Sequence, residues 1–126
     1  MSDARLAYQE AAVRGARPVR LTILLYEQVI QDLARGAEAI ARDDSEALAR
    51  EVSHATGVIG YLQATLNRDA GASVVRNLAS FYTMLRERLM EAQVRRSREV
   101  LADLRQQMLE VREAWLKVEE DTGDVA

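Results

Sequence analysis

The sequence predicts an all-α domain, an antiparallel four-helix bundle with a short N-terminal helical arm. The 126 residues include 20 Ala and 15 Leu but Gly 6, Pro 1 and Cys 0, so helix formers are abundant and turn formers are scarce. Apolar residues also recur three and four positions apart in four long segments, and the breaks between these segments are short. The same composition excludes an all-β or disulfide-framed fold.

Pro18 marks the start of the first long helix, because the N–H that proline lacks would have no partner at that position. Turn residues and candidate caps set the remaining boundaries. The expected segments are an arm over 1–17, a bundle over 18–120 with helices at about 18–42, 46–66, 74–94 and 98–120, and a flexible tail over 121–126.

The second helix has the clearest start, because Asp43, Asp44 and Ser45 are all candidate N-caps. Asp43 also has Glu46 three residues later, the spacing of a capping box.

The third helix has Ser73 as a candidate cap. Gly and Pro are absent from there until Gly123, so the turn expected near 95–97 depends on ordinary helix lengths alone.

Each helix carries one apolar stripe along its length. Four such stripes joined by short connections indicate near-parallel packing of the coiled-coil type. The predicted core residues are Ile23, Tyr26, Ile30, Leu33, Ala37, Ile40, Leu48, Val52, Ala55, Ile59, Leu62, Leu66, Leu78, Tyr82, Leu85, Leu89, Ala92, Leu101, Leu104, Met108, Val111, Trp115 and Val118.

Charge and motifs exclude several classes of function. Lys+Arg 17 against Asp+Glu 20 gives a net charge of −3, so nucleic acid is not an expected partner. The N-terminal residues show no apolar run of the length that a signal peptide or membrane span needs, so membrane insertion is not expected. The lack of cysteine favours a cytoplasmic location and removes thiolate catalysis.

One element of a di-iron site is present, the Glu-x-x-His spacing of Glu51 and His54. By helical phase both side chains point away from the core stripe of their helix, and His54 is the only histidine. We interpret them as a solvated surface pair and expect no metal, cofactor or catalytic residue; a metalloenzyme is the alternative that this spacing leaves open.

Further apolar or small residues lie outside these stripes. Two of them are glycines in a helix interior, which cost roughly 1 kcal/mol each relative to alanine, so a close approach by another helix is expected there. These outer residues are Leu21, Leu25 and Val29 in the first helix, Gly57, Gly60, Tyr61 and Ala64 in the second, and Leu109 and Leu116 in the fourth.

Together the outer residues favour docking of amphipathic helices from a partner that folds as it binds. Two other interpretations stay open: the outer residues widen the core, or they form a homodimer interface, as in a self-associating bundle.

Short motifs in the arm and in three of the helices occur in the order of a known family. They are Ala7-Tyr8, Pro18-x-x-Leu21-Thr22-x-Leu24-Leu25-Tyr26, Asn77-Leu78-x-x-Phe81-Tyr82, Arg88-Leu89-x-x-Ala92 and Glu110-Val-Arg-Glu-Ala-Trp115. As a set they resemble the flagellar secretion chaperone family FliS.

This resemblance implies a cytoplasmic bundle without catalytic activity that binds the C-terminal helical segment of newly made flagellin. Such a chaperone prevents premature polymerisation and delivers flagellin for flagellar type III export. The resemblance also implies that the arm packs on the bundle through Tyr8 and Val13 and that the outer residues bind the client. An adaptor with a different helical client, further export or regulatory partners, and a homodimer without client remain alternatives.

Overall fold

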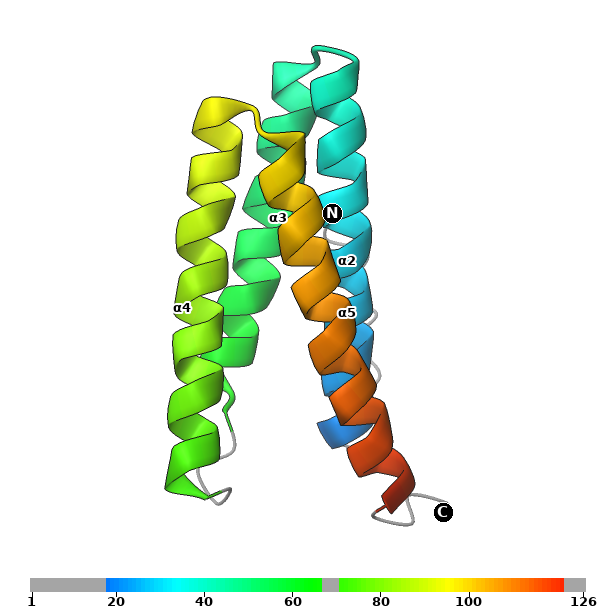
Figure 1. Ribbon diagram of the computed structural model, residues 1–126, viewed down its shortest axis with the longest axis vertical. Coiled ribbons are helices and arrows are strands. Elements are labelled where there is room, and N and C mark those ends of the chain that lie inside the picture. The colour runs from blue at the N-terminus through cyan, green and yellow to red at the C-terminus, as the bar shows by residue number, and fades with distance from the viewer. Residues whose placement is uncertain (1–17, 67–70, 122–126) are drawn as a thin grey trace.

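The computed structural model describes residues 18–66 and 71–121, which form four helices packed antiparallel to their neighbours (Figure 1). This arrangement confirms the predicted all-α four-helix fold; the expected arm over 1–17 lies outside the described residues. The helices are α2 at Pro18–Ala41, α3 at Ser45–Ala64, α4 at Ala72–Arg95 and α5 at Arg98–Asp121. Asp121, which was expected in the tail, is the last residue of α5.

Helix α2 is central, because it packs along both α3 and α5. Helix α4 packs on α3 and, less extensively, on α5. In Figure 1, α4 and α5 are close at the turn that joins them and diverge toward the start of α4 and the end of α5. Helices α3 and α5 are diagonal to each other, and their backbones do not approach closely among the described residues.

The turn before α3 is capped by Asp44, whose side chain accepts a hydrogen bond from the Ala47 N–H at 3.0 Å. Asp43 instead takes a positive φ of 56°, so the predicted capping box of Asp43 and Glu46 is wrong. An aspartate tolerates this left-handed conformation better than most residues do. The one-residue shift of the cap therefore follows from the turn.

The turn between α4 and α5 lies where its position was predicted. Arg96 ends α4 in the left-handed conformation, and its N–H bonds to the last turn of the helix. Ser97 then caps α5 by accepting the Val100 N–H at 3.1 Å. The predicted cap of α4, Ser73, is wrong: Gly71 is the N-cap, and it makes no side-chain cap.

The core joins the predicted stripes from all four helices. Most of the predicted core residues are buried, and Val118 is an exception at 40% exposed. Gly36 lies at a close contact of α2 with its neighbours: a Cβ there would lie 3.3 Å from Leu101 Cδ1 and 3.6 Å from Leu48 Cδ1. Glycine at this position therefore lets α3 and α5 both approach the same side of α2.

Three aromatic side chains connect α2, α4 and α5. The hydroxyl groups of Tyr26 and Tyr82 are hydrogen bonded at 2.8 Å, and both tyrosines are buried. Trp115 packs edge-on against Tyr26, with ring centroids 6.5 Å apart. Its Nε1 is buried and has no hydrogen-bond partner among the described residues. Burial raises the pKa of both tyrosines, so each stays neutral and can donate or accept.

Replacing either tyrosine alone is expected to cost nearly as much as replacing both. Tyr26→Phe leaves the Tyr82 hydroxyl buried without a partner, a loss of about 1 to 3 kcal/mol in the free energy of unfolding. Tyr26→Phe with Tyr82→Phe removes both polar groups, so the second substitution adds little. Urea unfolding of the two single variants and the double variant measures this coupling, and additive losses would contradict it.

Candidate functional site

The outer side of α3 carries small residues that face away from the bundle. Gly57 and Ala64 are exposed and Gly60 is half-buried. A Cβ added at Gly57 or at Gly60 meets no atom of the described residues within 4 Å. Packing within the described part of the chain therefore does not require these glycines, whereas a second helix could approach closely there.

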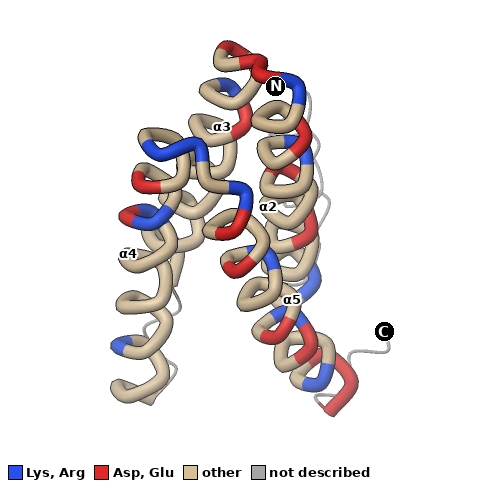
Figure 2. The backbone as a smooth tube through the Cα atoms, turned by 45° about the horizontal axis from the view of Figure 1, so that its top comes forward, with Lys and Arg blue, Asp and Glu red and all other residues tan. Residues whose placement is uncertain are grey.

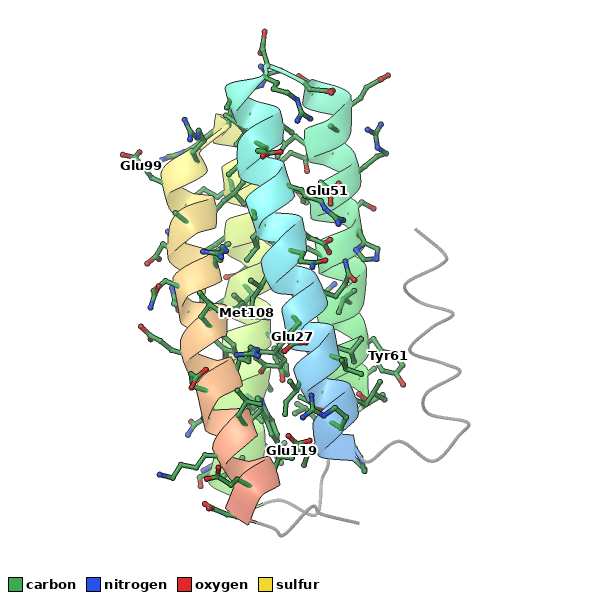
Figure 3. The ribbon with its side chains drawn as sticks, turned by 90° about the vertical axis from the view of Figure 1, so that its right-hand side faces the viewer. Glu27, Glu51, Tyr61, Glu99, Met108 and Glu119 are labelled. Atoms are coloured by element: carbon green, nitrogen blue, oxygen red, sulfur yellow. The ribbon has the colours of Figure 1, made fainter. Side chains whose placement is uncertain are left out.

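Tyr61 borders these small residues on the side that faces α2, and it is 43% exposed. Figure 3 shows its side chain at the outer edge of α3, away from Met108 in the core. A ring of this size with an accessible hydroxyl is a common anchor in protein interfaces. We call Gly57, Gly60, Tyr61 and Ala64 the α3 outer face.

Two of the predicted outer residues of α2 are core residues. Leu25 is 4% exposed and Val29 is 0% exposed, so the expectation that they lie outside the core is wrong. The reason is that α2 packs extensively on both α3 and α5, so its buried surface is wider than one stripe. Leu21, one turn earlier on the same side, is partly buried against the core.

The α5 residues of the predicted set lie on a different side of the molecule. Leu109 and Leu116 are half-buried, and they share a helix face with Arg112, which bonds to Glu27 of α2 at 2.9 Å. Because α5 is diagonal to α3, these two leucines do not join the α3 outer face. The structure thus separates residues that were predicted to form one surface.

Several exposed apolar residues were missed. Met90 is 61% exposed and Val94 is 76% exposed, both on α4 near its turn with α5. Val74, at the start of α4, is 48% exposed. The first half of α4 carries Arg76 as its one charged residue, and Figure 2 shows this part of the helix as mostly tan, that is, mostly uncharged. Helical phase places these positions outside the predicted core stripe of α4, and they are exposed because α4 packs less extensively on its two neighbours than α2 does.

A polar array of side chains joins α2 to α3, one turn before the α3 outer face begins. His54 Nδ1 lies 2.6 Å from Asp32 Oδ2, and Gln28 Nε2 donates to Asp32 Oδ1 at 3.0 Å. The side chain of Asp32 is 1% exposed and that of His54 is 13% exposed. The interpretation of His54 as a solvated surface residue is therefore wrong. The residue in the sequence that could have indicated this contact is Asp32. It follows Leu25 by seven residues and therefore lies on the same, α3-facing side of α2.

Glu51 lies one turn before His54 and is half-buried (Figure 3). Burial, and next the nearby charge of Asp32, raise the pKa of Glu51. Burial also raises the pKa of Asp32, an effect that the contact with His54 partly offsets. Within the described part of the chain, no cluster of three or more acidic or histidine side chains could hold a metal ion.

Two further findings bear on the expected partners. Among the described helices, none combines the length and apolar character needed to cross a membrane. The arm residues Tyr8 and Val13, expected to pack on the bundle, lie outside the described residues.

The fold and the α3 outer face define a helical bundle with uncovered helix surface and no constellation for catalysis in its described residues. The family model for the flagellar protein FliS matches residues 1–122, so the chain belongs to the FliS family of flagellar secretion chaperones, which are not enzymes.

Curated relatives agree with this family. The flagellar secretion chaperone FliS of Bacillus subtilis (strain 168) is 30% identical over 109 residues, covering 86% of this chain and 80% of the relative. FliSB of Pseudomonas aeruginosa is 30% identical over 106 residues, with 84% of each chain covered. FliS of Salmonella typhimurium is 26% identical over 110 residues, covering 86% of this chain and 82% of the relative.

Burial predicts opposite outcomes for aspartate at two positions. Leu25→Asp places a carboxylate in the core and is expected to lower the free energy of unfolding by about 3 kcal/mol or more. Tyr61→Asp changes an exposed side chain and should stay within about 1 kcal/mol of the unchanged protein. Thermal unfolding followed by circular dichroism compares the two; equal losses would place Tyr61 in the core as well.

The open space beside the glycines predicts that alanine stabilises the free protein. Gly57→Ala and Gly60→Ala should each raise the free energy of unfolding by up to about 1 kcal/mol, because alanine has the higher helix propensity and meets no neighbour. Urea unfolding measures the change. A loss of stability at either position would mean that the glycine is needed by the fold itself.

Proposed function

We propose that this chain binds the C-terminal helical segment of newly made flagellin, with the α3 outer face as the main docking surface. The family match over residues 1–122 carries the proposal, because it defines a flagellar secretion chaperone. The exposed Tyr61 and the two open glycines support α3 as the place where a client helix approaches. The chain holds the client and does no chemistry on it.

The physical basis of the chaperone action is occupancy. A segment that is disordered when free can fold as a helix on an uncovered apolar surface, and it gains burial that offsets the loss of chain entropy. While it is bound, the same segment is not available for polymerisation. In this proposal the complex forms in the cytoplasm and delivers flagellin for flagellar type III export.

Leu109 and Leu116 extend the proposal to a second contact. They lie on the α2–α5 side, so a client that reaches both them and the α3 outer face must wrap around α2. Leu21 lies on the α3-facing side of α2, between the two regions, and is partly exposed. Leu25 and Val29 are core residues, and they pack beneath the part of α2 that carries Leu21. Tyr8 and Val13 belong to the proposed docking of the arm.

The decisive measurement is calorimetric titration of the full chain with an isolated flagellin C-terminal segment. A one-to-one complex that gains helical circular dichroism is expected. Gly57→Gln should weaken it by about tenfold or more, because the larger side chain blocks close approach of a helix while favouring the helical state of α3. Ser80→Gln, on the exposed side of α4, is the matched control and should bind as the unchanged protein does.

Two outcomes would contradict the proposal. The absence of any complex at micromolar concentrations would remove flagellin as the client. Equal affinity of Gly57→Gln and Ser80→Gln would move the docking surface away from α3, and Leu116→Gln then tests the α2–α5 side. Light scattering of the free chain distinguishes the alternative of a self-associating bundle, which predicts a stable dimer that buries these same residues.

A further inference from the structure

The contact between Asp32 and His54 ties α2 to α3 through a buried carboxylate. The two side chains meet at 2.6 Å, and Gln28 holds the second carboxylate oxygen at 3.0 Å. A carboxylate that is 1% exposed is costly unless its charge is compensated. Among the described side chains that bond to Asp32, His54 is the one that can carry a positive charge. We call Gln28, Asp32 and His54 the α2–α3 latch.

The charge of the latch depends on one proton. With that proton present, on either the carboxylate or the imidazole, the Asp32 and His54 pair is neutral overall. Without it, the pair holds a buried net negative charge. Glu51 adds a second negative charge nearby, and Arg35 and Arg50 oppose it from the solvent side. No charged group of α4 or α5 in the described chain is among those that act on this site.

The latch lies next to the proposed docking surface. His54 precedes Gly57 by one turn of α3, and Tyr61 follows on the same side as His54 after two turns. Asp32 likewise follows Leu25 and Leu21 along the α3-facing side of α2. We call the α3 outer face and Leu21 of α2 together the α2–α3 docking surface. Its shape depends on what holds these two helices together.

We propose that Asp32 and His54 form a proton-linked latch, which holds the α2–α3 docking surface in place while the pair keeps its shared proton and loosens it when that proton is lost. The docking part of this proposal rests on the proposed function, whereas the latch itself does not. Loss of the proton leaves a buried negative charge, and separating α2 from α3 lets water reach it.

The direction of the pH effect follows from Asp32. Its pKa is raised in the folded state, so the native chain keeps this proton to a higher pH than the unfolded chain does. The stabilisation is present below the ordinary aspartate pKa of 3.8 and is lost as pH rises through the native pKa. Stability relative to a chain without this carboxylate must therefore fall with rising pH.

Urea unfolding of the full chain between about pH 4.5 and pH 9 tests the latch. Asp32→Asn keeps the shape of the side chain and an oxygen that can accept from Gln28, but it cannot ionise. The ratio of the unfolding constants of the unchanged protein and Asp32→Asn should increase with pH, by about tenfold for each unit by which the native pKa exceeds the ordinary value. A ratio that stays flat or decreases would overturn the proposal.

A double-mutant cycle with His54→Gln separates the latch from a general effect of burial. The coupling between positions 32 and 54 should be about tenfold larger, as a ratio of unfolding constants, near pH 5 than near pH 9. Near pH 5 the pair keeps its shared proton and is neutral overall, whereas near pH 9 the buried carboxylate is ionised without a compensating positive charge. Coupling that does not change with pH would contradict a shared proton. Asp103→Asn is the control of opposite sign, because Arg88 lowers the pKa of that exposed carboxyl.

Titration with the flagellin C-terminal segment over the same pH range tests the link to docking. The affinity of the unchanged protein should fall with rising pH, whereas that of Asp32→Asn should not. Identical pH profiles would overturn the link. If the unchanged protein binds no segment at any pH, the proposed function fails, and the unfolding measurements still decide whether the latch exists.

Discussion

The bundle depends on the burial of α2 between α3 and α5. Helix α2 has two extensive neighbours, and its apolar residues therefore cover more than the single stripe of a helix with one buried side. Gly36 makes this arrangement possible, because its missing side chain lets Leu48 and Leu101 approach the same backbone. Tyr26 then connects this helix to Tyr82 of α4 and Trp115 of α5. The removal of these apolar side chains from water is the main force that stabilises the fold.

The same geometry explains where helix surface remains exposed among the described residues. Helix α3 presents its core stripe to α2 and α4, and its opposite side carries small residues that no described residue covers. Helix α4 diverges from α5, which leaves Val74 and other apolar side chains partly exposed. The side of α3 that no described residue covers is the surface proposed for the client helix.

The polar array shows what a periodicity argument overlooks. His54 points away from the centre of its own core stripe, as helical phase predicts, yet it is mostly buried because α2 supplies Asp32 on that side. A residue outside the stripe of one helix is exposed only if no neighbour reaches it. Leu25 and Val29 were misplaced for the same reason, since α2 buries two sides. Val118 is the opposite case, since it was predicted to be a core residue and is exposed. It lies near the end of α5, where α4 and α5 diverge.

The motifs of the sequence indicated the family by resemblance. The sequence by itself also determined the four helices of the described residues and most of their core positions. These features depend on local propensity and on spacing along one helix, and both are set by residues that are close together in the sequence. Only the tertiary structure decided that Leu25 and Val29 are core, that Asp32 and His54 meet, and that Leu109 lies apart from Tyr61. Each of these depends on which helices are adjacent and how far each contact extends. Residues distant in the chain set that adjacency together, so no single helix reveals it.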